Sequence, residues 1–395
     1  MKILLLAGEE SGELYARQIR ERFAHDEVRG YGDYGFRTED LAVMGIEEVL
    51  KNIFFLLRVK RTMERAIDAW RPDVVCTIDY PGMNMKLAAY ARARGIRTVH
   101  VVCPQVWAWK AGRIPKIERT FDRLCCFLPF EPGIFRPGFA EFVGHPLAEQ
   151  FKREEGSGKR DEGSGMREEG LTLALLPGSR LGEIEKHLPV MLETLRSMAL
   201  PAGLRVEIPA ANDRAYAAIS RVVDAVVRQR PVADCQLSVS HGGARELLLR
   251  ADCAVVASGT ATLEAALAGC PTVLVYKASP IFAFIARRVI KGIRFVGLAN
   301  IIWDKTLSQR GIPPPVSEAP MPELLQENLT VENLRRELQP LLSDAAARQR
   351  AKARLSAATD LLKSDGDAIG RIAAAVRMSC WTSFSPGVSP LSGAT

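Results

Sequence analysis

The stretch Leu175-Leu-Pro-Gly-Ser-Arg180 leads from an apolar segment into a turn of Pro, Gly and Ser, and a similar turn recurs at Ser258-Gly-Thr-Ala-Thr-Leu-Glu264. Each stretch is typical of a buried strand that ends in a turn opening a helix, where backbone N–H groups and the positive helix end suit an anion. The guanidinium of Arg180 matches phosphate oxygens. The carboxylate of Glu264, one turn into its helix, can accept from a ribose hydroxyl pair. Two such turns predict a nucleotide diphosphate held across strand ends.

Apolar runs alternate with helical segments on both sides of these turns, which is typical of βα units with a parallel sheet. Expected strands cover residues 3–7, 73–78, 98–103, 123–127, 171–176, 205–208, 253–256 and 272–276. Expected helices cover residues 11–23, 85–94, 113–120, 182–198, 213–229 and 261–268. The predicted fold class is α/β, with two Rossmann-like doubly wound parallel-sheet domains that face a cleft.

Composition predicts the domain boundaries. Residues 151–170 (FKREEGSGKRDEGSGMREEG) have almost no apolar side chains and contain two Gly-Ser-Gly elements, which is linker composition. We expect an N-terminal domain over 1–150 and a C-terminal domain over 171–345. Residues 346–376 are predicted to form a helix that packs back on the N-terminal domain or exchanges with a second subunit, and residues 377–395 a disordered tail.

Bulk properties exclude several classes of protein. The 395 residues are 47% hydrophobic and 25% charged, as in a globular protein, and no apolar run approaches the roughly 20 residues of a membrane span. No secretory leader is recognisable, because the apolar start soon meets Glu9 and Glu10. The net charge of +7 suits several anionic partners, but the dispersed basic residues and the lack of a recognition motif argue against nucleic acid. The eight cysteines form no CxxC pair, so we expect buried reduced thiols and no metal ion.

Two polar motifs follow predicted strands near the N-terminus. Ala7-Gly-Glu-Glu-Ser-Gly-Glu13 has glycines that permit a tight turn and carboxylates that cap the next helix or contact substrate. In Ile78-Asp-Tyr-Pro-Gly-Met-Asn84, Asp79 ends an apolar strand, where poor solvation can raise its pKa and make it a general base. Capping of the next helix is the commoner use of such an aspartate. The candidate contacts in these motifs are Gly8, Glu9, Ser11, Gly12 and Asn84.

The segment Cys103-Pro-Gln-Val-Trp-Ala-Trp-Lys110 offers Gln105 and Trp107 for contact with a sugar or an acyl chain, while the alternative is that the indoles fill a core. His145, in Phe142-Val-Gly-His-Pro146, follows a further strand. A lone histidine is usually structural, but this one could touch the ligand. We also place Asn212 among the candidate contacts.

Residues 50–60 (LKNIFFLLRVK) combine a continuous apolar side with basic flanks. The pattern is equally typical of a core helix and of an interfacial membrane contact. Residues 281–291 (IFAFIARRVIK) have a similar character. The candidate membrane contacts are Phe54, Phe55, Leu57, Arg58 and Lys60.

In order, these motifs resemble those of the lipid-A-disaccharide synthases, a family of inverting two-domain glycosyltransferases of the GT-B type. So many motifs in one order are specific, whereas SGTATLE alone also fits sugar-nucleotide epimerases. The resemblance covers residues 1–345 and rests on AGEESGE (7–13), LAVMGIEEVL (41–50), IDYPGMN (78–84), PQVWAWKAGRIPKI (104–117), LPFEP (128–132), FVGHPLAE (142–149), LLPGSRLGEI (175–184), SGTATLEAALAGCP (258–271), ANII (299–302) and PELLQE (322–327).

The resemblance implies transfer of diacylglucosamine from UDP-diacylglucosamine to the 6-hydroxyl of diacylglucosamine 1-phosphate. It implies that Asp79 is the general base and that Arg180 is needed for donor binding, with no cofactor and no metal. The acylated substrates imply a cytoplasmic protein that is peripheral on the inner membrane and favour the membrane interpretation of residues 50–61. A homodimer is also considered. The expected UDP-binding residues are Gly178, Ser179, Ser258, Gly259, Thr260, Glu264, Asn300 and Gln326.

The chain departs from the family pattern in three places. Glu13 stands where the family usually has Asp, and the segment between Val28 and Leu41 is short and lacks a Gly-Gly-Pro loop. Residues 304–321 (DKTLSQRGIPPPVSEAPM) are an insertion, expected to be a lid over the nucleotide or a tolerated surface loop. Two other functions fit the motifs: another GT-B-type UDP-sugar enzyme (a lipid-acceptor glycosyltransferase or a UDP-sugar 2-epimerase), and a nucleotide-regulated membrane-surface binding protein without turnover.

Overall fold

The computed structural model describes residues 1–8, 10–37, 41, 53–156, 170–229, 235–279, 288, 292–364 and 367–381. The chain divides into two compact units, each with its own sheet and core. The first unit comprises Met1–Phe127, Glu131–Gly144 and the segment that begins at Ser364, and the second comprises Leu128–Phe130 and His145–Lys363.

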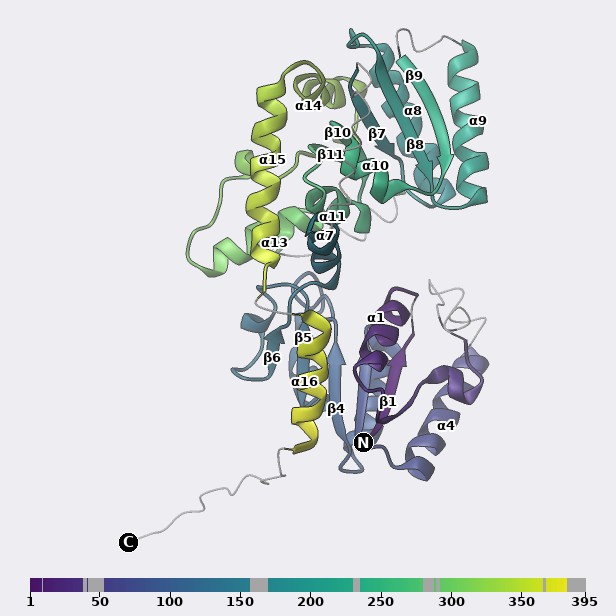
Figure 1. Ribbon diagram of the computed structural model, residues 1–395, viewed down its shortest axis with the longest axis vertical. Helices are drawn as coiled ribbons and strands as arrows, with labels where there is room; N and C mark the ends of the chain where they lie inside the picture. The colour runs from purple at the N-terminus through teal and green to yellow at the C-terminus, as the bar shows by residue number, and fades with distance from the viewer. Residues whose placement is uncertain are drawn as a thin grey trace. The chain divides into compact units, whose positions relative to one another are not determined.

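The first unit is built on a six-stranded sheet of order β2-β1-β3-β4-β5-β6, in which neighbouring strands are parallel (Figure 1). All five side chains of β3 are buried, because helices cover both faces of the sheet. The strands are β1 (Lys2–Ala7), β2 (Glu27–Arg29), β3 (Val74–Ile78), β4 (Arg97–Val101), β5 (Arg123–Cys126) and β6 (Ala140–Phe142).

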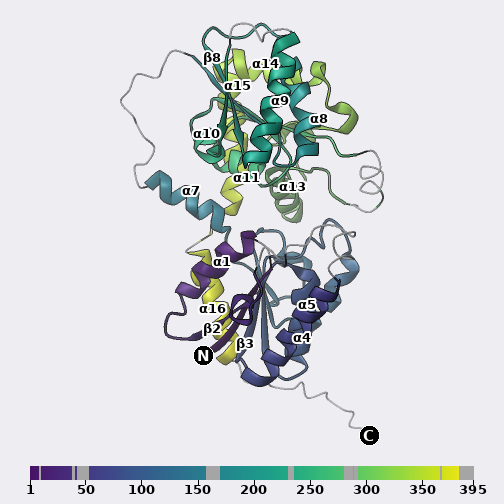
Figure 2. The same cartoon turned by 90° about the vertical axis from the view of Figure 1, so that its right-hand side faces the viewer.

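Helices pack on both faces of this sheet (Figure 2). On one face α1 (Glu10–Glu21) lies beside α16 (Ala368–Trp381), and the two share a core with the sheet. On the other face lie α4 (Ile53–Trp70), α5 (Pro81–Arg92) and α6 (Ile114–Thr120). The short 3₁₀ turns are η1 (Tyr31–Tyr34), η2 (Ala111–Arg113) and η3 (Pro132–Ile134).

The second unit has a six-stranded parallel sheet of order β12-β11-β10-β7-β8-β9. The central strands β7 and β10 are entirely buried, as their continuous apolar sequences predict. The strands are β7 (Thr172–Leu176), β8 (Leu204–Ala210), β9 (Cys235–His241), β10 (Cys253–Ala257), β11 (Thr272–Tyr276) and β12 (Glu323–Leu325).

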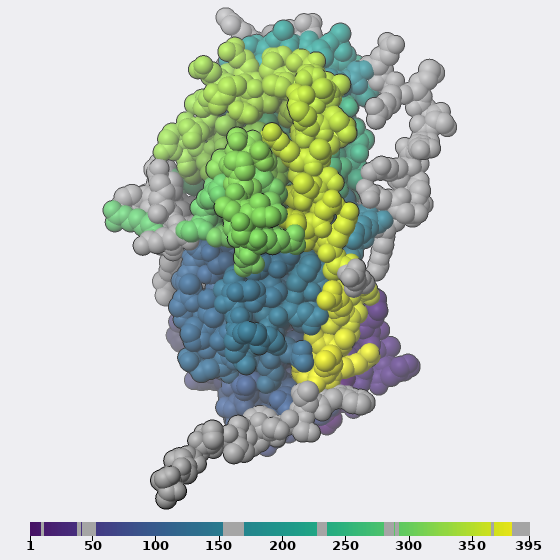
Figure 3. Space-filling model, turned by 90° about the vertical axis from the view of Figure 1, so that its left-hand side faces the viewer, coloured from purple at the N-terminus to yellow at the C-terminus, as the bar shows by residue number. Residues whose placement is uncertain are grey.

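Helices also cover both faces of the second sheet. On one face pack α8 (Leu181–Arg196), α9 (Asp213–Gln229) and α14 (Val331–Ser343). The opposite face carries α10 (Ala244–Arg250) and α11 (Thr260–Leu267), with α13 (Leu298–Gln309) and α15 (Ala345–Thr359) beside them. Figure 3 shows the yellow-green atoms of α14 and α15 on the surface of this unit. The remaining elements are α7 (Pro146–Gly156), η4 (Val316–Glu318), η5 (Gln326–Asn328) and η6 (Asp360–Leu362).

The structure confirms the α/β class and corrects several predicted boundaries. The first six residues of the predicted linker, 151–156, belong to α7, and the second unit begins at His145 rather than at 171. The predicted tail helix is two helices, of which α15 lies in the second unit and α16 in the first. Residues 377–381, expected to be disordered, complete α16, and residues 382–395 lie outside the described part. None of the described helices has the length and apolar character needed to cross a bilayer.

Candidate functional site

Several strands of both sheets end in backbone conformations that ordinary residues avoid. Asp79 and Tyr80 follow β3 with φ of 47° and 48°, Val102 follows β4 with φ of 72°, and Gln326 follows β12 with φ of 53°. Non-glycine residues enter this left-handed region at an energetic cost, and such strain collects at functional sites. Ligands of parallel sheets bind at the carboxyl ends of the strands. The strained residues therefore mark these ends as candidate sites in each unit.

Asp79 is held at the end of β3 by its neighbours. Its N–H donates to the carbonyl oxygen of Val101 in β4 at 2.9 Å. Burial raises the pKa of its carboxyl group above the ordinary value, although a hydrogen bond from the backbone of Tyr80 opposes the shift. The N-cap of α5 is Tyr80, with no side-chain capping bond, so Asp79 does not cap the next helix. A partly buried carboxylate with a raised pKa is suited to accept a proton.

Asn84 holds the backbone around Asp79. Its side chain is fully buried, and its Nδ2 donates to the carbonyl oxygens of Asp79 at 2.8 Å and Ile78 at 3.2 Å. Its Oδ1 accepts from the hydroxyl group of Tyr31 at 2.9 Å. These bonds give Asn84 a structural role, and its predicted contact with substrate stays a prediction. Tyr31 lies in the shortened segment after Val28, where the sequence offered no sign of a link to this loop.

Gly8 makes room for the loop that carries Asp79. A Cβ atom at Gly8 would lie 2.3 Å from the Tyr80 ring, so no other residue fits without moving Tyr80. A Cβ atom added at Gly12 would lie 3.5 Å from Ala7 and Ile78, which is an ordinary contact distance. Glu9 and the side chain of Ser11 lie outside the described residues, so their predicted contacts stay predictions.

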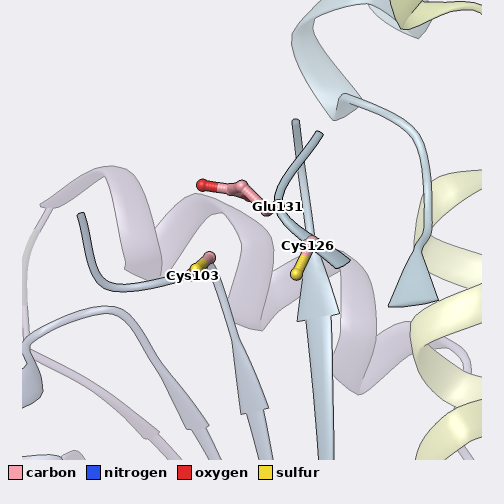
Figure 4. A group of neighbouring side chains, drawn as sticks. All are labelled: Cys103, Cys126 and Glu131. Atoms are coloured by element: carbon pink, nitrogen blue, oxygen red, sulfur yellow. The ribbon is translucent and has the colours of Figure 1, made fainter. Parts of the chain in front are cut away.

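The tryptophan-containing loop after β4 is partly buried. Trp107 donates from Nε1 to Oε1 of Glu131 at 3.0 Å, while Gln105 is exposed. Figure 4 shows Glu131 beside Cys103 and Cys126. A buried partner for Trp107 favours a fixed loop, and its contact with substrate stays a prediction.

His145 directly precedes α7 and is buried. Its Nδ1 lies 3.2 Å from the backbone nitrogen of Leu147, which donates to it at the start of the helix. Burial lowers its pKa to about 4. His145 is therefore neutral at physiological pH and supports the helix start, which agrees with the structural alternative.

The turn after β7 contains the predicted anion site. Gly178 has φ of +114°, and a Cβ atom there would lie 2.5 Å from Oε2 of Glu183. Arg180 is the N-cap residue of α8, and its side chain is 68% exposed while it pairs with Oε1 of Glu183 at 3.1 Å. Ser179, between them, is exposed. An exposed guanidinium beside a helix N-terminus can leave its carboxylate partner and bind a phosphate instead.

His187 ties this turn to a second strand end. It is fully buried in α8, with Nδ1 2.8 Å from the carbonyl oxygen of Pro177 and Nε2 2.9 Å from the backbone nitrogen of Lys277. Because the amide of Lys277 must donate to Nε2, the proton of the neutral ring is on Nδ1 and bonds to Pro177. Burial lowers the pKa of His187. The sequence gave no sign of this residue, because its two partners lie in different loops.

The turn after β10 lies beside that of β11. The N–H of Ser258 donates to the carbonyl oxygen of Val275 at 3.0 Å, and Gly259 is the N-cap of α11, whose first residue is Thr260. Burial raises the pKa of Glu264, while nearby Arg245 opposes the shift. These residues stay candidates for the nucleotide, with α11 contributing its N-terminus and Glu264 a carboxyl group.

Three candidate polar residues of this unit have different surroundings. Asn300 is fully buried, with Nδ2 donating to Glu323 Oε1 at 2.8 Å and Oδ1 accepting from the backbone of Met321 at 3.0 Å. Asn212 accepts from the N–H of Ala215 at 2.9 Å and so caps α9. Both side chains make hydrogen bonds within the protein in this arrangement, and their predicted contacts with the ligand stay predictions. Gln326, at the strained end of β12, stays a candidate.

Helix α4 divides the predicted membrane contacts between two faces. Phe54 is 83% exposed and Leu57 44% exposed, and Arg58 is exposed beside them. Phe55 instead packs against Phe36, with ring centroids 6.1 Å apart, and Lys60 pairs with Glu64 at 2.5 Å. The buried face of α4 agrees with the core-helix interpretation of this segment. Its exposed apolar face agrees with the membrane-contact interpretation, which stays a prediction.

Within 281–291 the structure describes only Arg288, so the predicted apolar and basic character of this segment at a membrane stays a prediction. The inserted residues 304–321 are not wholly a loop, because 304–309 complete α13. Asp304 within the helix pairs with Arg294 at 3.1 Å, which anchors the start of the insertion.

Comparisons with known proteins agree with these motifs. The family model described as lipid-A-disaccharide synthetase matches residues 3–366. The lipid-A-disaccharide synthase of Chromohalobacter salexigens is 34% identical over 375 residues, covering 90% of this chain and 92% of the relative. That of Xylella fastidiosa is 35% identical over 346 residues, covering 83% and 86%.

Solved structures show the same fold at low identity. A co-structure of S. aureus MnaA with UDP matches with a TM-score of 0.57 and 12% identity, covering 94% of this chain and 95% of that one. The calicheamicin glycosyltransferase CalG4 matches with a TM-score of 0.53 and 14% identity, covering 96% and 98%. Sequence and fold together place the chain in the lipid-A-disaccharide synthase family of GT-B-type glycosyltransferases.

Proposed function

We propose that the chain transfers diacylglucosamine from UDP-2,3-diacylglucosamine to the 6-hydroxyl of 2,3-diacylglucosamine 1-phosphate. The products are UDP and the β-1,6-linked tetraacyl disaccharide 1-phosphate. Family membership supports the reaction. The observation that carries the chemistry is the position of Asp79, a partly buried carboxyl group with a raised pKa at a strained strand end.

Asp79 acts as the general base. Its carboxylate removes the proton of the acceptor hydroxyl as the oxygen attacks the anomeric carbon from the face opposite UDP, so the configuration inverts. The bond to the UDP oxygen breaks in the same step. Asn84 and Gly8 hold the loop of Asp79 and keep the carboxylate in place.

The second unit binds the donor. Arg180 leaves Glu183 to contact the diphosphate, and the N-termini of α8 and α11 add backbone N–H groups for the developing negative charge. Glu264 accepts from the ribose hydroxyls. The proposal assigns leaving-group stabilisation to these groups and to no metal ion.

The exposed face of α4 supports a peripheral location on the cytoplasmic face of the inner membrane, where the acylated substrates lie. Phe54 and Leu57 enter the headgroup region while Arg58 contacts anionic lipid. Binding to vesicles of phosphatidylglycerol and phosphatidylethanolamine should fall in Phe54→Ser/Leu57→Ser and remain in the control Leu249→Ser, which removes an exposed leucine of the second unit. Equal binding by both variants would exclude this face. A homodimer remains a proposal for light scattering to test.

One assay tests the reaction. Purified protein is incubated with UDP-diacylglucosamine, with and without diacylglucosamine 1-phosphate, and the products are identified by mass spectrometry. A tetraacyl disaccharide 1-phosphate formed only with the acceptor is the expected result. Consumption of the UDP-sugar without acceptor would instead indicate an epimerase, and UDP binding without turnover a binding protein.

A further inference from the structure

Two thiols and a carboxylate meet in the first unit at the ends of β4 and β5. Cys103, Cys126 and Glu131 are all buried, and their ligand atoms lie within 4.8 Å of one another. Figure 4 shows the three side chains converging from the loop after β4, the last residue of β5 and the start of η3. No other set of at least three His, Cys, Asp or Glu side chains within the described residues is grouped in this way.

We propose that Cys103, Cys126 and Glu131 form a binding site for one thiophilic divalent cation, Zn²⁺. Thiolate sulfur and carboxylate oxygen are both zinc ligands, and two sulfurs on one tetrahedral zinc lie about 3.8 Å apart. The observed grouping therefore needs only side-chain adjustments. As each sulfur–zinc bond forms, the thiol proton passes to solvent, and a water molecule completes the four ligands.

The surroundings of the cluster match those of a metal site. Trp107 donates from Nε1 to Oε1 of Glu131 at 3.0 Å, which fixes the carboxylate as an outer-shell donor does. The Cys103 thiol is hydrogen-bonded with Cys126 and Glu131 and also donates to the carbonyl oxygen of Pro104 at 3.3 Å. These bonds are weak because S–H is a weak donor, so a cation bound to the two sulfurs and the carboxylate could replace them.

The backbone turns Cys103 toward its partners at an energetic cost. Val102 has φ of 72°, a conformation that is a genuine outlier for a β-branched residue. Its N–H donates to the carbonyl oxygen of Cys125 at 3.0 Å, which locks this bend to β5. A cation shared by Cys103 and Cys126 would join the same two segments and hold Trp107 through Glu131.

The wide spacing of Cys103 and Cys126 in the sequence explains why it indicates reduced thiols and no metal site. Cys103 follows β4 and Cys126 ends β5, with a whole helical crossover between them, so no short zinc motif connects them. Only the parallel pairing of β4 with β5 brings their side chains together. The proposed cation site does not depend on the proposed glycosyl transfer.

The test uses metal-free full-length protein titrated with Co²⁺ alone and then with Zn²⁺. One Co²⁺ per chain should bind with a thiolate charge-transfer band and the visible bands of a tetrahedral ion, and Zn²⁺ should displace it. Cys103→Ala and Cys126→Ala should abolish the thiolate band and weaken Zn²⁺ binding on the order of 100-fold or more. Trp107→Phe, which keeps all three ligands, should weaken it about 10-fold.

Cys125→Ala is the matched control, because Cys125 is buried in the same strand but belongs to the core on the opposite face of the sheet. It should bind Co²⁺ and Zn²⁺ as the unaltered protein does. The proposal is wrong if the unaltered protein shows no thiolate band with Co²⁺, or if Cys125→Ala loses the band as Cys103→Ala does. It is also wrong if intact-mass and peptide analysis finds a Cys103–Cys126 disulfide in protein purified under nitrogen with reductant. Should the variants fail to fold, the spectrum and zinc stoichiometry of the unaltered protein still decide the question.

Discussion

In both units, polar loops follow the carboxyl ends of the strands of a parallel sheet, but the residues of these loops differ between the units. In the first unit, Asp79 and Tyr80 adopt left-handed conformations without being glycine. In the second, the turn after β7 that carries the predicted anion site uses a glycine, Gly178 with φ of +114°, although Gln326 after β12 is also left-handed. A strained loop held by buried partners fixes one side chain, whereas a glycine turn brings backbone N–H groups close to a ligand.

The charged groups of the two units also differ, in how far water reaches them. Burial raises the pKa of Asp79, while the side chain of Arg180 is 68% exposed and pairs with Glu183. A carboxyl group poised to take a proton needs poor solvation, and a cation that captures a diphosphate from solvent needs freedom to move. The contrast supports the proposal that the first unit transfers the proton and the second binds the donor.

The largest expected effect comes from Asp79→Asn, which keeps the shape of the side chain but removes the base. The turnover number should fall on the order of 10²- to 10⁴-fold, with the KM of both substrates little changed. Asp224→Asn, on the exposed surface of α9, is the control and should have near-normal turnover. Near-normal turnover by Asp79→Asn would end the assignment of the base.

Removal of the cation in the second unit should cost less. Arg180→Ala should lower kcat/KM for the donor about 10²-fold, because the diphosphate loses a charged partner as its charge develops. Arg180→Lys should recover part of this loss, since lysine keeps the charge but not the planar fork. UDP affinity measured by calorimetry should follow the same order, and an unchanged affinity in Arg180→Ala would contradict donor binding.

Paired glycine substitutions test whether the loops have separate roles. Gly8→Ala pushes on the Tyr80 ring and should impair the acceptor reaction about 10-fold, with the KM of the donor unchanged. Gly178→Ala pushes on Glu183 and should raise the KM of the donor about 10-fold. Gly182→Ala, where an added Cβ meets nothing within 4 Å, is the control. If Gly8→Ala and Gly178→Ala gave the same kinetic pattern, the division of roles would fail.

The smallest expected effect concerns the stability of the first unit at acid pH. Burial lowers the pKa of His100 to about 3, well below its ordinary value of about 6.5. Between these values the unfolded chain binds a proton that the folded chain does not, so the free energy of unfolding should fall by about 1.4 kcal/mol per pH unit as the pH drops.

Urea unfolding of the unaltered protein and of His100→Asn at several pH values between about 7 and about 4.5 measures this slope. The variant should be less stable at neutral pH but should have a shallower pH dependence. Equal slopes would mean that His100 takes up its proton in the folded state. His187 in the second unit should contribute a loss in the same direction, because burial also lowers its pKa.

The parts of the fold that could be predicted are those with continuous local patterns. The apolar runs predict the first and last residues of β3, β7 and β10 to within one or two positions. Helix α9 begins and ends where its amphipathic pattern predicts. Helix α5 begins earlier than expected, at Pro81, because proline is favourable as the first residue of a helix. Strand β9 was missed, since it lies at the sheet edge and its side chains are only half-buried or exposed.

The site was only partly predictable, because local sequence cannot show which partners arrive from elsewhere. Asp79 and Arg180 stood out by their positions at strand ends. Asn84 and Asn300 looked equivalent to them, but Tyr31 and Glu323, distant in sequence, occupy their amide groups. His187 was invisible for the same reason, since its two hydrogen bonds join separate loops.

Helix α16 has a consequence for how the protein is made. Ile369, Ile372 and Val376 are core residues of the unit that contains the first strand, yet they are among the last described residues to be synthesised. Domains usually fold in the order in which they leave the ribosome. Here residues 145–363 are translated entirely before that helix. The unit that starts second is thus the first to have all its parts, and on the N-terminal sheet α1 lacks its neighbour until α16 is translated.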